Sequence, residues 1–156
     1  MNNVLAMDLF ERILNLRYTE SIREEKGGTY GVAISGGISQ LPEETYRLQV
    51  NFTTDPEMAP ELMEIVSKEI EKIAKEGPRQ EDLAKVKEYL AKSRPEGLRS
   101  NARWMRFLLA YYVDGNDNFT DYDRVIDEVD GEAIQALAAK ILADGNLIRL
   151  VMSPEK

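Results

Sequence analysis

Apolar residues recur every three or four positions along the first segment of the chain, from Val4 to Glu25. The members of this series are Leu5, Leu9, Ile13, Leu16 and Ile22. This period is that of an amphipathic α-helix packed by one face against a core. Two glycines, Gly27 and Gly28, follow directly and predict its end, because glycine commonly stands just past the last helical turn.

Alternation with a period of two follows in two short runs, Thr29 to Ser35 and Tyr46 to Thr54. In the second run, apolar residues (Leu48, Val50, Phe52) alternate with polar ones, and the polar ones are Arg47, Gln49, Asn51 and Thr53. The pattern predicts two strands joined by a hairpin-type loop over 36–44, which contains Gly-Gly and a proline. We expect helices behind the apolar face and water in front of the polar face.

The next segment carries a helix-start signal at Asp55-Pro56, with the aspartate as N-cap and the proline at the first helical position. The apolar stripe of this helix is Met58, Leu62, Val66, Ile70 and Ile73. Gly77-Pro78 predicts its end, and a second helix begins near Gln80. Its inward residues are Leu83, Val86 and Leu90, and we expect Pro95 and Gly97 to kink or break it.

The last third of the chain predicts three more helices and a closing strand. The first of them carries Trp104, and the others span Tyr122 to Glu128 and Glu132 to Leu142, the last with Asp130 as its cap. Asp144-Gly145-Asn146 then turns the chain into a strand from Leu147 to Met152.

The predicted order is therefore α-β-β-α-α-α-α-α-β. This order indicates one α+β domain over residues 1–156, with helices packed on one face of an antiparallel or mixed sheet. Three strands fall below the usual roughly four to six, so we expect a truncated domain whose N-terminal strands lie outside the sequence. A missing strand exposes a sheet edge, and dimerisation through that edge would be an artefact of truncation.

Composition narrows the choice of partners. The chain has 156 residues, of which 43% are hydrophobic and 31% charged, as in a soluble globular protein. The net charge of −8 argues against nucleic acid or an anionic membrane as the main partner. No stretch approaches the ~20 apolar residues that span a bilayer, and no targeting leader is visible.

Two residue types are missing altogether. The chain has no cysteine and no histidine, which removes disulfides, thiolate nucleophiles, imidazole bases and the usual ligands of zinc. A metal here would have only carboxylate and carbonyl ligands, which suit calcium or magnesium better than catalytic zinc. We therefore expect no metal site in this chain and no hydrolysis by this chain alone.

The most specific candidate for chemistry is Arg23-Glu-Glu-Lys-Gly-Gly-Thr-Tyr30, where an arginine ends a helix and a tyrosine starts a strand. In one interpretation, Arg23 donates to a peptide carbonyl or carboxylate and the Tyr30 hydroxyl donates to an oxyanion. In the other, Arg23 pairs with Glu20 or Glu24 at a helix end and Tyr30 packs in the sheet. Spacing alone favours this structural interpretation.

Other clusters predict ordinary structure. The acidic run from Asp114 to Asp123 fails the helix-loop-helix calcium pattern, because Phe119 replaces the sixth-position glycine and Val125 the twelfth-position glutamate. We expect a solvated turn there. Trp104, Phe107 and Tyr111 lie at helical spacing, which is more typical of a core than of a ligand platform.

The stretch from Leu16 to Val32 resembles a helix-turn-strand segment of the pitrilysin/insulinase family of zinc metallopeptidases. That family carries an R-E-x-x-G-x-x-Y pattern in a C-terminal domain, and its four positions are matched by Arg23, Glu24, Gly27 and Tyr30. The order of the later elements agrees as well, from the polar-faced strand through the Trp104 helix to the closing strand.

The resemblance implies a non-zinc, substrate-binding C-terminal portion of a zinc metalloendopeptidase. In such enzymes two halves enclose a chamber, and zinc is held by an inverted H-x-x-E-H motif in a separate N-terminal domain. Arg23 and Tyr30 would then contact the substrate, and the polar strand face carrying Arg47, Gln49, Asn51 and Thr53 would look into the chamber. Strict alternation places Tyr30 on the helix-packed face unless a bulge near Gly28 re-aims it.

The implied partners are a peptide or small protein substrate and a zinc-bearing domain or subunit, with zinc as the cofactor of the parent enzyme. The expected location is the periplasm or cytoplasm of a bacterium. Two other functions stay open on the sequence: a non-catalytic scaffold or partner subunit of the same fold, and an unrelated α+β binding domain.

Overall fold

The computed structural model describes residues 3–24, 29, 31–39, 41–113, 115, 117, 119–120 and 122–153, without the side chains of residues 3, 23 and 24. Its first helix, α1, spans Asn3–Tyr18 and continues directly into a π-helix, η1, over Thr19–Glu24. The predicted N-terminal helix is therefore confirmed, with a last turn that is wound more widely than an α-helix.

Two antiparallel strands follow, β1 over Val32–Ser39 and β2 over Thr45–Phe52. The second strand agrees with its prediction to within two residues. The first was placed too early: it begins at Val32 rather than Thr29 and includes Gly36 and Gly37, which the sequence assigned to the loop. Neither glycine has a positive φ, so both continue the extended strand.

The helix after the hairpin, α2, spans Ala59–Glu76 and begins later than predicted. Asp55 and Pro56 instead form a turn, in which Met58 N–H donates to the Asp55 carbonyl (3.0 Å). Pro60 occupies the first turn of the helix in place of Pro56. The end at Gly77 is confirmed, and its φ of 77° explains why glycine stands there.

Four further helices complete the described chain: α3 (Gln80–Gly97), α4 (Asn101–Val113), α5 (Tyr122–Glu128) and α6 (Gly131–Asp144). Pro95 does not break the helix, because α3 continues through it, but the helix ends at Gly97, the second residue expected to kink or break it. The α6 cap is confirmed, since Asp130 Oδ1 accepts the Ala133 N–H at 2.8 Å.

The predicted closing strand is wrong for this structure. Residues 145–153 form no helix or strand, and the apolar side chains from Leu147 to Met152 are exposed, Ile148 by 90%. Among the described residues, the sheet consists of β1 and β2 alone. The segment has a strand-like composition, but within the described residues its backbone pairs with neither β1 nor β2.

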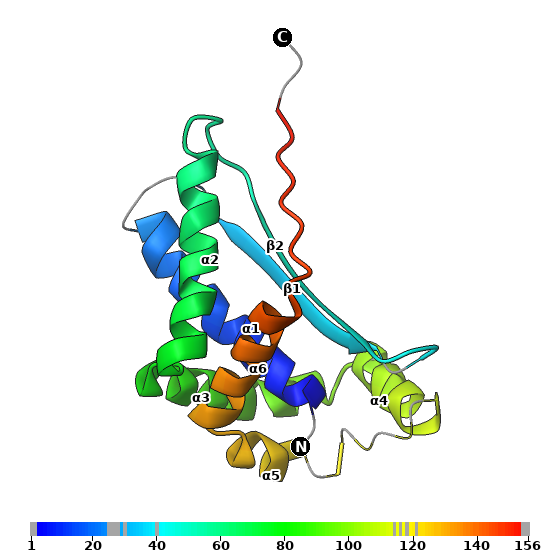
Figure 1. Ribbon diagram of the computed structural model, residues 1–156. Helices are drawn as coiled ribbons and strands as arrows, with labels where there is room; N and C mark the ends of the chain where they lie inside the picture. Colours follow the sequence, from blue (N-terminus) through cyan, green and yellow to red (C-terminus); the bar gives the residue numbers. More distant parts are fainter. Residues whose placement is uncertain are drawn as a thin grey trace.

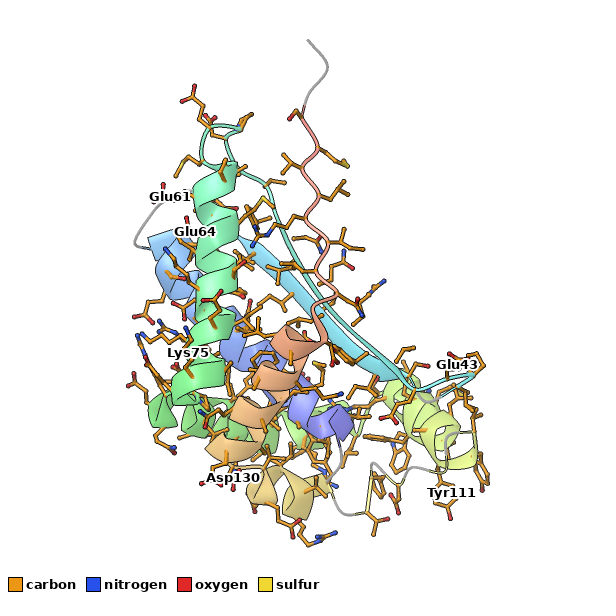
Figure 2. All side chains as sticks on the ribbon, in the orientation of Figure 1. Glu43, Glu61, Glu64, Lys75, Tyr111 and Asp130 are labelled. Atoms are coloured by element: carbon orange, nitrogen blue, oxygen red, sulfur yellow. The ribbon has the colours of Figure 1, made fainter. Side chains whose placement is uncertain are left out.

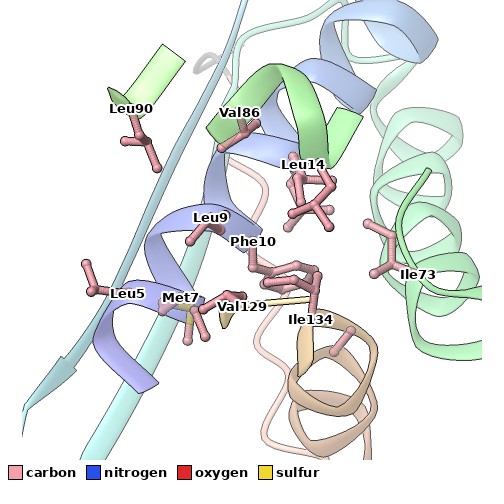
Figure 3. Packing of buried hydrophobic residues seen from close by; sticks show 14 of the residues in the cluster. Leu5, Met7, Leu9, Phe10, Leu14, Ile73, Val86, Leu90, Val129 and Ile134 are labelled. Carbon is pink, nitrogen blue, oxygen red and sulfur yellow. The ribbon is translucent and has the colours of Figure 1, made fainter. Parts of the chain in front are cut away.

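The core lies between α1 and the elements around it. Figure 3 shows Phe10 and Leu14 of α1 surrounded by Ile73 of α2, Val86 of α3 and Ile134 of α6. The apolar face of the hairpin packs against the same cluster. Helices therefore cover one face of the sheet (Figure 1), and the predicted α+β class is confirmed.

The aromatic residues of α4 are not buried in the core, contrary to the expectation from their spacing. None of its residues is buried, and Trp104 and Tyr111 are among the exposed large side chains. Figure 1 shows α4 set apart from α2, α3 and α6.

Candidate functional site

The open face of the β-hairpin brings together the polar strand residues predicted from the sequence. Its β2 row consists of Thr45, Arg47, Gln49 and Asn51. Opposite them in register stand the β1 residues Ser39, Gly37, Ser35 and Ala33. On the open face, the small β1 residues therefore lie beside the longer polar side chains of β2. The β2 side chains project farther from the sheet than the β1 residues do.

The polar row offers several hydrogen-bonding groups to a molecule lying on it. Gln49 Nε2 donates to Asn51 Oδ1 at 3.1 Å, which aligns these two amides along the strand. Arg47 is exposed and lies beside a shallow hollow of about 290 Å³ over Gly37. Thr53 is exposed but follows the end of β2, so it extends the row beyond the sheet. Such amides and guanidinium groups can pair with the carbonyl and N–H groups of an extended peptide.

The opposite face of the hairpin is fixed to α1. The Gly36 N–H donates to Glu11 Oε2 at 2.9 Å, and a Cβ at Gly36 would lie 3.1 Å from Met7 Cγ. Glycine therefore permits the close approach of helix and strand, and the site is supported from behind by the core.

The hairpin is also tied to the end of α6. Tyr46 on β2 donates from its hydroxyl to Asp144 Oδ2 at 2.5 Å. This hydrogen bond raises the pKa of Tyr46 to about 12 and lowers the pKa of Asp144. No local pattern indicates this pair, because 98 positions separate the two residues.

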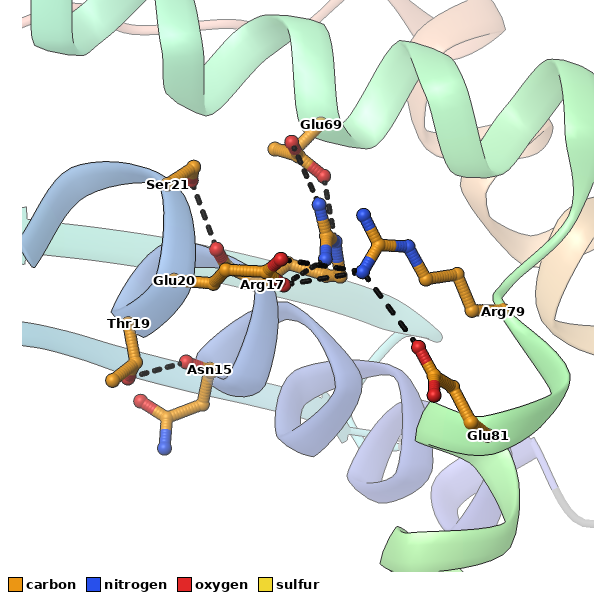
Figure 4. Close-up of polar contacts among 8 residues, drawn as sticks. All are labelled: Asn15, Arg17, Thr19, Glu20, Ser21, Glu69, Arg79 and Glu81. Carbon is orange, nitrogen blue, oxygen red and sulfur yellow. Dashed lines mark hydrogen bonds and ion pairs between the residues drawn. The ribbon is translucent and has the colours of Figure 1, made fainter. Parts of the chain in front are cut away.

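A partly buried ion-pair network joins the end of α1 to α2 and to the start of α3 (Figure 4). Arg17 Nε donates to Glu69 Oε2 at 3.1 Å, and its Nη1 also pairs with Glu20. Glu20 in turn accepts from Arg79 at 3.2 Å. The buried Tyr18 hydroxyl donates to the Val66 carbonyl at 3.0 Å, which adds a second link from α1 to α2.

The charges of this network favour the ionised arginine. Burial by itself lowers the pKa of Arg17, but the hydrogen bond and charge of Glu69, with Glu20 and Asp82, outweigh it and raise that pKa. Asp82 is buried, and its Oδ2 has no hydrogen-bond partner among the described residues. The positive charge of Arg17 offsets the charge of Asp82 without a hydrogen bond between them. We therefore interpret the cluster as a structural one that holds η1 in place.

The predicted substrate-binding pair falls largely outside the described residues. Arg23 is in η1, yet its side chain is not described, and Tyr30 is not described at all. Their contact with a substrate and the orientation of Tyr30 therefore stay predictions. A π-helix is a rare local structure that is frequent at functional sites, which keeps this end of α1 of interest.

The side chains of this chain that could act as metal ligands do not fit zinc. The chain lacks histidine and cysteine, and within the described residues no group of three acidic side chains is placed to hold a metal ion. None of the helices in the described part of the chain is long and apolar enough to cross a membrane.

Comparison with known proteins places this geometry in context. A family model described as the peptidase M16 inactive domain matches residues 2–90. The chain is 30% identical over 108 residues to a zinc protease PQQL-like protein of Arabidopsis thaliana, an alignment that covers 65% of this chain. The chain spans only 11% of the length of that relative.

Two solved structures share the fold. The peptidase M16 inactive domain from Pseudomonas fluorescens is 26% identical with a TM-score of 0.69, covering 86% of this chain and 33% of that one. The periplasmic protease PqqL from Escherichia coli is 20% identical with a TM-score of 0.69, covering 87% of this chain and 15% of that one.

Proposed function

The chain belongs to the peptidase M16 inactive-domain family, and we propose that it is the peptide-holding, non-zinc portion of a zinc metalloendopeptidase of the pitrilysin/insulinase type. The family confirms the sequence resemblance and excludes the unrelated α+β domain. The peptide bound by the domain and the activity of the longer protein are both part of this proposal.

The observation that carries the proposal is the polar open face of the hairpin. Helices cover the other face, so the open face is where a second molecule can reach the sheet. Arg47, Gln49 and Asn51 supply donors and acceptors along an extended line, and the small β1 residues leave room for a peptide main chain. The substrate would be a peptide or small protein.

In this proposal the chain binds the substrate peptide and does not itself hold the catalytic metal. The residues of this chain do not offer the ligands that zinc prefers, so in this proposal a separate domain or subunit would hold the metal, which would supply the polarisation of the scissile carbonyl. Arg23 and Tyr30 would add contacts to the bound peptide and its developing oxyanion. Arg23→Ala should slow cleavage by the assembled enzyme without changing the thermal stability of this domain.

The exposed apolar segment 147–152 supports the proposal that the domain is completed by further strands of the longer protein. Its composition suits a strand that is covered on both faces. The periplasm is the proposed location, by similarity to the E. coli protease described as periplasmic.

A scaffold or partner subunit is the second candidate, because the family description is that of an inactive domain. Peptide binding separates the two. Fluorescence anisotropy of a short, unstructured, fluorescein-labelled peptide should rise on titration with this chain, and the peptide should stay uncleaved with added zinc. The Arg47→Ala/Gln49→Ala/Asn51→Ala variant should bind about tenfold or more weakly. A chain that leaves the anisotropy unchanged is a scaffold.

A further inference from the structure

The last turn of the first helix is wound more widely than the rest. Helix α1 spans Asn3–Tyr18, and η1 continues it as a π-helix over Thr19–Glu24. A π-helix connects each carbonyl to the N–H five residues on, so its turn holds about one residue more than an α-helical turn. Because each residue of an α-helix advances the helix by about 100°, the extra residue rotates every later position by about that angle. The wide turn therefore determines on which side of the helix Arg23 stands.

Two side-chain hydroxyl groups bond to the backbone at the start of this turn (Figure 4). Thr19 Oγ1 donates to the Asn15 carbonyl and Ser21 Oγ donates to the Arg17 carbonyl, each at 2.8 Å. Both acceptors lie four residues back, where an α-helix directs its own N–H groups. A hydroxyl bonded to such a carbonyl competes with the backbone N–H and loosens the α-helical ladder. The Ser21 hydrogen bond is buried, which shields it from competing water.

One hydroxyl of this kind is not enough to widen a helix. Ser67 Oγ donates to the Met63 carbonyl at 3.2 Å, also four residues back, and α2 stays α-helical through that turn. Ser67 lies three positions after the exposed Glu64, which points to the outside of α2 in Figure 2. The end of α1 differs, because two such bonds lie two residues apart and Glu20 between them accepts from Arg79 at 3.2 Å. Three successive side chains therefore hold η1 in its wide form.

We propose that Thr19 and Ser21 are positioning residues, which keep η1 wide and thereby set the side of the helix from which Arg23 meets a bound peptide. This role rests on the proposed function, in which Arg23 contacts the peptide. A straight α-helix would rotate position 23 by about 100° and move it away from that approach. A turn that is already wide before the peptide arrives needs no ordering on binding, which is how preorganisation raises affinity.

Hydrogen-bond scalar couplings in the isotope-labelled chain measure the winding of the turn, because they identify the carbonyl to which each N–H bonds. In the parent chain the N–H groups at the end of η1 should couple to carbonyls five residues back. In the Thr19→Ala/Ser21→Ala variant they should couple to carbonyls four residues back. Ser67→Ala removes the same kind of bond from α2 and is the matched control, which should leave η1 wide. A wide turn that persists in the double variant overturns the proposal.

Peptide binding by the whole chain tests the consequence for Arg23. In the anisotropy titration of the labelled peptide, Thr19→Ala/Ser21→Ala should weaken binding by about fivefold or more, and circular dichroism should show the variant folded. Thr19→Ser keeps the hydroxyl and should bind as the parent does. In an Arg23→Ala background the double substitution should cause no further loss, because the two hydroxyls act through that side chain.

The outcomes separate this role from the proposed function. If Arg23→Ala alone leaves binding unchanged, Arg23 does not contact the peptide, and the contact and its positioning both fail. If Arg23→Ala weakens binding but the double variant binds as tightly as the parent, only the positioning role of Thr19 and Ser21 is overturned. An equal loss with and without Arg23 overturns it as well, because a purely structural effect would not depend on that side chain.

Discussion

The Glu11 carboxylate accepts the Gly36 N–H at 2.9 Å, which fixes β1 to α1 at a strand position that has no side chain. Helix and strand approach so closely there that an added Cβ would lie 3.1 Å from Met7 Cγ and 3.2 Å from its sulfur. This relationship explains why glycine stands at position 36 inside a strand that the sequence assigned to a loop.

Gly36→Ala should destabilise the domain by about 1–3 kcal/mol, because buried Met7 has little room to move. Gly37→Ala is the matched control, since nothing lies within 4 Å of its added Cβ on the open face. It should be neutral or stabilise by up to about 1 kcal/mol. Urea unfolding of both variants measures the difference, and equal losses would show that the close contact is absent.

Glu69→Gln should cost about 3 kcal/mol, because it removes the main partner of buried Arg17. Glu64, which pairs with Lys68 on the same helix, is fully exposed, so Glu64→Gln should leave the unfolding midpoint unchanged. Thermal unfolding followed by circular dichroism tests the pair of variants. A Glu69→Gln protein as stable as the parent would mean that the Arg17 network contributes little.

Tyr46→Phe should change how the stability of the domain depends on pH, at both acidic and alkaline pH. The hydrogen bond lowers the pKa of Asp144, so its stabilisation is present above the ordinary value of 3.8 and is lost as the pH falls through the lowered pKa. It raises the pKa of Tyr46, so the same stabilisation is full below pH 10 and disappears as the pH rises through about 12.

NMR titration of the side-chain carboxyl groups measures this effect. In the Tyr46→Phe variant the pKa of Asp144 should rise toward its ordinary value. Asp117, whose pKa is lowered by hydrogen bonds from Thr120 and Phe119, should titrate unchanged. An unaltered Asp144 titration would place the tyrosine hydroxyl elsewhere.

Ile134→Ala and Ile148→Ala test whether the C-terminal segment is part of the folded core. Ile134 is fully buried in α6, and its truncation should cost about 2–5 kcal/mol. Ile148 is 90% exposed, and its truncation should change the unfolding free energy by less than about 0.5 kcal/mol. A large loss at Ile148 would restore the closing strand predicted from the sequence.

The elements that the sequence predicts well are those whose own residues determine them. The 3.6-residue apolar period of α2 and α3 and the alternation of β2 placed the correct side chains toward the core, because each pattern matches one local geometry. The Asp130 cap was predictable for the same reason, since it acts within three residues.

The features that the sequence missed depend on distant partners. Gly36 lies in β1 at a point where α1 approaches closely, and segment 147–152 pairs with neither strand of the described sheet. The Arg17–Glu69 pair joins residues 52 positions apart, and no local spacing indicates it. The polar face of β2 was predictable from the alternation of its residues. The small β1 residues that lie beside it could be identified only from the register of the two strands.

The most direct test of the central claim is chemical-shift mapping of the isotope-labelled chain with a short unstructured peptide. We expect the amide signals of residues 33–39 and 45–51 to move on titration, together with the side-chain amides of Gln49 and Asn51. We expect the outer faces of α2 and α3 to be unaffected. Shifts confined to helices, or none at saturating peptide, would contradict a peptide-holding role for the open face of the hairpin.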